Sequence, residues 1–148
     1  MITKYLTTIA FSFLILTSCN SDIESSEQIN GLWNFQSIIA FDCMEEEQNI
    51  VENFGNASCE EKNGATHCLN GTANFLDGIV IYTYNNLING VLDEQLIQEG
   101  TYSFSSQNDN QIAICFDSCM VGILTLSSST LNFDYKDTNC NYRISAFK

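Results

Sequence analysis

The clearest pattern in the sequence is an alternation of apolar and polar residues that dominates from Gly31 onward. The segment TYSFS at 101–105 alternates without a break, and LNFDY at 131–135 places its leucine, phenylalanine and tyrosine on one face. A period of two, together with many aromatic and β-branched residues, is typical of half-buried β-strands. The pattern predicts about eight strands, near residues 31–41, 72–77, 79–86, 96–105, 110–116, 120–127, 131–136 and 140–147.

Short polar breaks separate these segments. Asp77-Gly78 lies between two apolar runs, which is a strong hairpin signal, and Asn89-Gly90 is a second candidate. Sequential strands joined by tight turns predict an all-β fold, an eight-stranded up-and-down antiparallel barrel. Closing the sheet also removes the free edges that would otherwise aggregate.

One segment departs from the alternation. Between Asp42 and Asn56, Ile50, Val51 and Phe54 recur at helical spacing, and Asp42 is followed by Glu45 as in a capping box. We therefore expect a short helix after the first strand. A loop at 58–71 follows it, and we expect disulfides to staple that excursion.

Residues 1–18 have the features of a secretory signal peptide. Lys4 precedes an uncharged apolar run, Tyr5 to Leu16, which is shorter than the roughly 20 residues that span a bilayer. The next residues, Leu16-Thr17-Ser18-Cys19, resemble the lipobox of bacterial lipoproteins. The resemblance implies cleavage before Cys19 and acylation of its thiol with palmitate-type chains. The alternative is an ordinary cleaved signal followed by an incidental cysteine.

Residues 19–28 would then form a lipidated tether to a domain at 29–148. Two or more acyl chains hold a protein firmly on a membrane, so the membrane is the expected partner, through the anchor alone. No aspartate follows Cys19 directly, which favours the outer membrane of the bacterial envelope. Asp22 and Glu24 resemble the acidic signals that send some lipoproteins to the cell surface; alternatively, they belong to a solvated linker.

The chain is strongly acidic, with a formal net charge of −13. Loss of Lys4 with a signal peptide would make it one unit more negative. Such a chain repels the phosphates of nucleic acid, so we exclude nucleic-acid binding.

Seven cysteines are present. With Cys19 acylated, an even set remains, and an exported domain of this size favours disulfides over zinc or free thiols. Zinc ligation through cysteine and His67 has no supporting Cys-x2-Cys spacing. Six cysteines allow fifteen pairings. The pairs we favour are Cys115–Cys119 across a turn, Cys59–Cys68 within a loop, and Cys43–Cys140 between a loop and the last strand.

A further resemblance covers nearly all of 29–148. The first predicted strand opens with Gly31-Leu32-Trp33, which resembles the first-strand motif of the lipocalins. The segments TANFLDGIVIYTY, GTYSF, GILTLSSSTLNFDY and YRISAFK follow in the order seen in small bacterial lipocalin-like lipoproteins. The resemblance implies that Trp33 plugs a closed end of the barrel beneath a basic side chain near the last strand. Arg143 either fills that role or pairs with a surface acid, and its place between Tyr142 and Ile144 favours the second role.

No catalytic or metal-binding constellation is evident, so we predict neither an enzyme nor a cofactor. Eight strands enclose a lumen that is filled by side chains or holds one small ligand. The predicted lining is aromatic: Trp33, Phe35, Phe75, Tyr82, Tyr102, Phe104, Phe116, Phe133 and Tyr142. These rings either fill the core or line a site for a small hydrophobic molecule or lipid. The corresponding functions are a ligand-binding lipoprotein or an interaction module whose protein partner the sequence does not identify.

Overall fold

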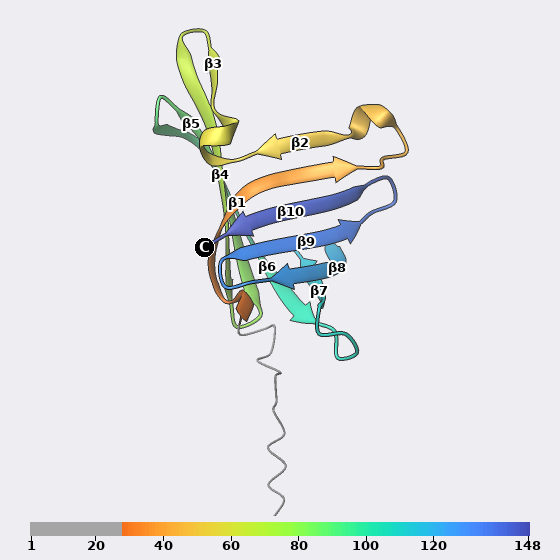
Figure 1. Cartoon of the computed structure of the whole chain (residues 1–148). Helices are drawn as coiled ribbons and strands as arrows, with labels where there is room; N and C mark the ends of the chain where they lie inside the picture. The colour runs from red at the N-terminus through yellow and green to blue at the C-terminus, as the bar shows by residue number, and fades with distance from the viewer. Residues whose placement is uncertain (1–27) are drawn as a thin grey trace, which may run out of the picture.

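The computed structural model describes residues 28–148; the predicted signal peptide, Cys19 and most of the tether lie outside them. Ten strands of this part form one antiparallel sheet, and pairing of the first with the fourth closes eight of them into a barrel (Figure 1). In chain order they are β1 (Gly31–Phe41), β2 (Ile50–Asn53), β3 (Glu60–Lys62), β4 (Ala65–Leu76), β5 (Ile79–Ile88), β6 (Val91–Phe104), β7 (Gln111–Cys115), β8 (Cys119–Leu126), β9 (Thr130–Lys136) and β10 (Asn141–Phe147). The predicted all-β, up-and-down antiparallel barrel of eight strands is confirmed.

Strand β1 closes the barrel because its two halves pair with different strands. Its first residues, Gly31–Asn34, pair with β4, and Ser37–Ala40 pair with the short strand β2. Strand β10 pairs with β1 from Asn34 to Phe41. The β1–β10 register shifts between Phe35 and Ser37, and such a bulge bends a strand and increases its twist. The bend separates the closed part of the barrel from the part that opens towards β2.

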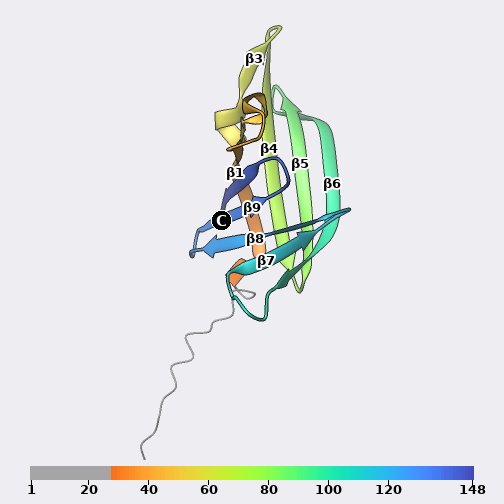
Figure 2. The same ribbon diagram turned by 90° about the vertical axis from the view of Figure 1, so that its right-hand side faces the viewer.

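Strands β4 and β6, with 12 and 14 residues, are the longest in the sheet, and the upper ends of β4, β5 and β6 rise above β7 to β10 (Figure 2). They run side by side and cross β7 and β8 at a steep angle. Strand β6 pairs with β7 only through Thr101–Phe104, whereas it pairs with β5 along nearly its whole length. Strands β6 and β7 are therefore hydrogen-bonded at one end of the barrel and separate from each other at the other end.

Three hairpin turns have an acidic or amide residue followed by glycine, both with positive φ. Asp77-Gly78 has φ angles of 50° and 83°, and Asn89-Gly90 has 52° and 77°. These values belong to the turn types that match the twist of paired strands, so both predicted hairpins are confirmed. Asn63-Gly64, with φ angles of 55° and 77°, forms a third turn that was not predicted. It joins β3 to β4.

The prediction for residues 42–71 is wrong in detail. In place of one helix over Asp42–Asn56, there is a 3-10 turn at Glu46–Gln48, then β2, then a second 3-10 turn at Gly55–Ser58. Ile50 and Val51 are 54% and 63% exposed, so only Phe54 of the apolar trio is buried. Backbone pairing with β1, rather than burial of a helical face, holds this segment. Most of the predicted loop at 58–71 is β3 and the first half of β4.

Residues 28–148 contain three disulfides, which are the three pairs predicted from the sequence: Cys43–Cys140, Cys59–Cys68 and Cys115–Cys119. Cys43–Cys140 ties the segment after β1 to the β9–β10 turn, where the backbone N–H of Met44 also donates to Asn139. Asp137 accepts hydrogen bonds from the backbone N–H groups of Cys140 and Asn139, which hold the pKa of its carboxyl below the usual range. This turn is thus fixed both covalently and by local hydrogen bonds.

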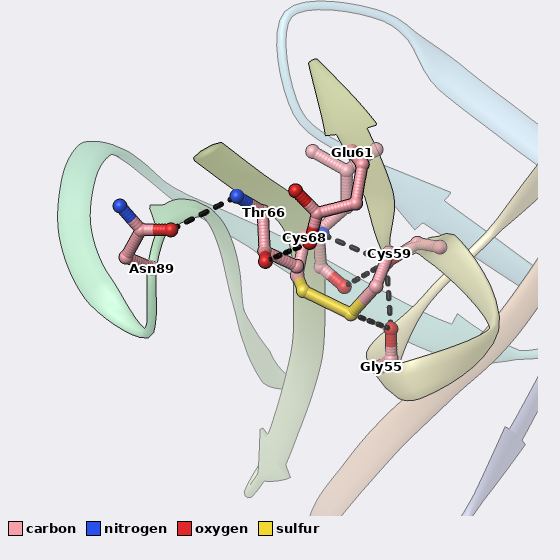
Figure 3. The surroundings of a disulfide bond; sticks show 8 residues. Gly55, Cys59, Glu61, Thr66, Cys68 and Asn89 are labelled. Atoms are coloured by element: carbon pink, nitrogen blue, oxygen red, sulfur yellow. Dashed lines mark hydrogen bonds between the residues drawn. A yellow bond between two sulfur atoms is a disulfide. The ribbon is translucent and has the colours of Figure 1, made fainter. Parts of the chain in front are cut away.

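Cys59–Cys68 fixes the base of the β3–β4 hairpin (Figure 3). Beside it, the Thr66 hydroxyl donates to the Glu61 carboxylate, and the Thr66 N–H donates to the Asn89 side chain at 2.9 Å. The second contact links the β3–β4 hairpin to the β5–β6 turn. The projecting ends of β4 and β5 are therefore held together beyond the point where the barrel closes.

We predict that removing Cys43–Cys140 destabilises the domain more than removing Cys115–Cys119. The first bond has a sequence separation of 97 and the second a separation of 4. Loop-closure entropy assigns them about 4.7 and about 2 kcal/mol. The paired serine variants, Cys43→Ser with Cys140→Ser and Cys115→Ser with Cys119→Ser, are compared by denaturant titration of the free energy of unfolding. Equal losses would contradict the prediction.

Candidate functional site

The barrel encloses an apolar cavity of about 400 Å³. Its lining residues alternate with outward-facing ones along the strands, as the period of two requires. The lining is Trp33, Phe35, Ile38, Ala73, Phe75, Val80, Tyr82, Gln98, Ile114, Phe116, Asp117, Ser118, Met120, Leu131, Phe133, Tyr135, Ile144 and Ala146. A partly enclosed apolar space with a few polar groups is the usual form of a small-molecule site.

Six of the aromatic residues predicted to line the interior do line this cavity: Trp33, Phe35, Phe75, Tyr82, Phe116 and Phe133. Tyr102, Phe104 and Tyr142 do not. Tyr102 is buried, packs at 5.2 Å against Phe75 and donates its hydroxyl hydrogen to the Asn30 side chain. Phe104 packs edge-on against Tyr102, so both belong to the core below the cavity. Tyr142 stacks on Tyr135 at 4.7 Å, one ring further from the space.

The closed end of the barrel is built around Trp33, which has no exposed surface. Its indole N–H donates to the Ile29 carbonyl at 2.6 Å. The Lys148 ammonium lies 4.5 Å from the ring centroid and also donates to the Asn30 carbonyl. The basic group over Trp33 is therefore Lys148. Arg143 forms a bidentate salt bridge with Asp134 on the outer surface. Its position between Tyr142 and Ile144 favoured this role.

The wall next to β6 depends on a glycine. A Cβ at Gly100 would lie 2.4 Å from the Cys115 carbonyl oxygen and 2.6 Å from the Phe116 ring. Because there is no side chain, the β7–β8 turn approaches β6 and Phe116 reaches the cavity, 6.4 Å from Tyr82. Cys115–Cys119 closes this turn, Cys115-Phe116-Asp117-Ser118-Cys119, which we call the stapled turn.

We place the opening of the cavity where β6 separates from β7, because the polar residues of the lining lie there. The β6–β7 pairing ends at Thr101 and Cys115, and Gln98, Asp117 and Ser118 line the cavity just beyond that point. These three residues were not among those predicted from the sequence. The close pair Cys115 and Cys119 could have drawn attention to the stapled turn. Nothing local marks Gln98, because its position depends on how β6 leaves the barrel.

Aromatic packing also closes the side below β2. Phe54 is 4% exposed and packs 5.6 Å from Phe35, which in turn lies 5.2 Å from Tyr82. Tyr84 contacts Phe54 edge-on and donates its hydroxyl hydrogen to Glu52 of β2. The segment after β1 therefore supplies one apolar ring and one carboxylate beside the cavity.

Two tyrosines that line the cavity have raised pKa values. Burial, and then the negative charge of Glu52, raises the pKa of Tyr82 to about 12. Burial, and then Tyr142 and Asp137, raises the pKa of Tyr135 to about 12. Both effects disfavour a negative charge at the cavity wall. Both tyrosines stay neutral over the physiological range and can act as hydrogen-bond donors.

Within residues 28–148, no three His, Cys, Asp or Glu side chains come together in a way that could hold a metal ion. Over the same residues, no helix is long and apolar enough to cross a membrane.

No known protein-family model matches this chain, and no curated protein matches it in sequence. We therefore infer function from the cavity and from the charges around it.

We predict that alkaline pH destabilises the fold. The pKa values of Tyr82 and Tyr135 rise from 10.0 to about 12 in the folded state. Between these two values the unfolded chain loses the phenol protons and the folded chain keeps them. The free energy of unfolding is therefore unaffected by these groups below pH 10 and falls as the pH rises towards 12. Denaturant titrations at increasing pH, with tyrosinate absorbance followed in parallel, measure the effect. Tyr82→Phe or Tyr135→Phe should make the loss less steep. A pH-independent free energy of unfolding between 10 and 12 would contradict this assignment.

Proposed function

We propose that this protein is a lipid-anchored, lipocalin-like lipoprotein of the bacterial envelope that binds a small hydrophobic molecule in its barrel. The cavity of about 400 Å³ is the single observation that carries the binding proposal. A barrel of eight strands can be filled completely by its own side chains, but this one keeps an apolar space that opens at one side. The space lies within the size range of known small-molecule sites.

The anchoring proposal rests on the sequence before the barrel. An apolar run ending in Leu16-Thr17-Ser18-Cys19 is the pattern of an acylated lipoprotein, and Cys19 stands outside the six cysteines that pair in the barrel. The described chain begins at Gln28, beside the closed end that contains Ile29 and Trp33. A tether from Cys19 would therefore place the closed end nearest the membrane and leave the cavity opening accessible.

Binding is tested with the predicted mature chain, residues 19–148, carrying Cys19→Ser and oxidised so that its disulfides form. The substitution removes the acylated thiol and with it the need for detergent, which would compete for the cavity. We expect N-phenylnaphthylamine to bind with a blue-shifted, stronger emission, because its rings leave water for an aromatic-lined space.

Ala73→Leu and Ala113→Leu provide a matched pair for this experiment. Ala73 lines the cavity, whereas Ala113 of β7 lies between the inward-facing Ile112 and Ile114 and is absent from the lining. The first variant should weaken dye binding by roughly ten-fold or more, because leucine fills part of the space, and the second should not. Thermal unfolding checks that both are folded. Equal binding by the two variants would place the dye elsewhere.

Anchoring is tested separately in cells. We expect the native chain to incorporate labelled palmitate and to fractionate with the outer membrane, and Cys19→Ser to lose both properties. Protease treatment of intact cells then separates surface display from a periplasmic orientation. Unchanged labelling of the Cys19→Ser variant would overturn the lipid anchor and would leave the cavity experiment unaffected.

An interaction module is the second candidate function. The first part of β6 pairs with β5 alone and carries four apolar side chains that are each at least half exposed: Val91, Leu92, Leu96 and Ile97. An exposed apolar strand edge can accept a strand from another protein. A cavity that takes up no dye would favour this function over ligand binding.

A further inference from the structure

The charge distribution around the cavity is one-sided. Of the described residues that line the cavity, only Asp117 carries a charge. It belongs to the stapled turn, beside the opening. A second carboxylate, Glu52, lies close enough to Tyr84 to accept its hydroxyl hydrogen at 3.3 Å. Lys148 lies over Trp33 at the closed end, bonded to backbone carbonyls, and is not part of the lining.

The two cavity tyrosines show what this arrangement does to an anion. Each phenol would become negatively charged on losing its proton, and that loss is made harder by burial and by nearby negative groups. A ligand carboxylate placed against the same wall would meet the same desolvation and the same repulsion. An ammonium group would also lose water, but it would be attracted by the carboxylates.

The aromatic lining acts in the same direction. Phe35, Tyr82 and Phe116 all line the space, and the Tyr82 ring lies 5.2 Å from Phe35 and 6.4 Å from Phe116. The negative faces of aromatic rings attract cations. The domain already contains one such contact, because the Lys148 ammonium lies 4.5 Å from the Trp33 centroid. Aromatic rings combined with a carboxylate are the usual recognition chemistry for amines and quaternary ammonium groups.

We propose that the cavity selects an apolar molecule bearing an amine or quaternary ammonium group, held near Asp117, and discriminates against fatty acids and other carboxylates. This inference rests on the proposed function, because it names the ligand class of the same cavity. In this proposal, Asp117, Gln98 and Ser118 at the opening contact the charged head group of the ligand. The aromatic rings deeper in the cavity contact its apolar body.

The test compares three molecules with the same decyl chain: decyltrimethylammonium, decanol and decanoate. Each displaces N-phenylnaphthylamine from the Cys19→Ser chain at neutral pH and low salt, below its micelle concentration. We expect decyltrimethylammonium to act at about ten-fold lower concentration than decanoate, with decanol between them. Raising the salt concentration should narrow the difference, because the cavity is partly open to screening ions.

Asp117→Asn and Asp109→Asn separate a local effect from the acidity of the whole chain. Both remove one negative charge, but Asp109 lies in the exposed β6–β7 connection and does not line the cavity. We expect Asp117→Asn to weaken decyltrimethylammonium several-fold and leave decanol unchanged, and Asp109→Asn to alter neither.

The outcomes distinguish the two proposals. Decanoate displacing the dye as well as decyltrimethylammonium would overturn the cationic selectivity and leave ligand binding intact. Equal effects of the two asparagine variants would also overturn it, because the preference would then be a property of net charge. A native chain that never binds the dye would instead overturn the proposed binding function.

Discussion

The pairing of β1 with both β4 and β10 is the constraint on which the rest of the structure depends. Without the four residue pairs from Gly31 to Asn34, the sheet would remain an open, strongly twisted layer. Trp33 lies at this junction, fully buried, and its indole N–H is satisfied by the Ile29 carbonyl. Burial of so large a ring contributes several kcal/mol only if its polar atom keeps a partner. Closure, the buried tryptophan and the segment before β1 therefore form one cooperative unit.

The cavity follows from the way large and small residues alternate across neighbouring strands. Ala73 pairs with Trp33 on one side and with Tyr82 on the other, and Ala146 pairs with Phe35. A small residue beside each large ring lets the rings fit inside a narrow barrel. The rings pack against one another at the closed end, but towards β6 the strands separate and no side chain fills the remaining volume. The splay of β6 from β7 thus turns a packed core into a site.

Most of the barrel could be predicted because apolar and polar residues alternate along its strands, and this pattern can be recognised without knowing the tertiary contacts. All eight barrel strands were identified, although β4 and β6 begin earlier than predicted. The short strands β2 and β3 could not be predicted in this way. They are exposed edge segments of four and three residues, and they exist because β1 and β4 offer them backbone partners. Ile50, Val51 and Phe54 fit a helical period by chance, since only Phe54 is buried.

The sequence predicted most of the aromatic rings of the candidate site but none of the polar residues at its opening. Inward-facing aromatic residues such as Phe75, Tyr82 and Phe133 are marked by their strands' alternation, which also defines the cavity wall. Asp117 comes from a turn, and a turn residue reaches a cavity only through three-dimensional closure. Here that closure requires Gly100, whose missing side chain admits Cys115 and Phe116 against β6. The apolar wall is thus a property of individual strands, whereas the charge beside the opening is a property of their packing. For that reason the ligand class can be argued only from the folded barrel.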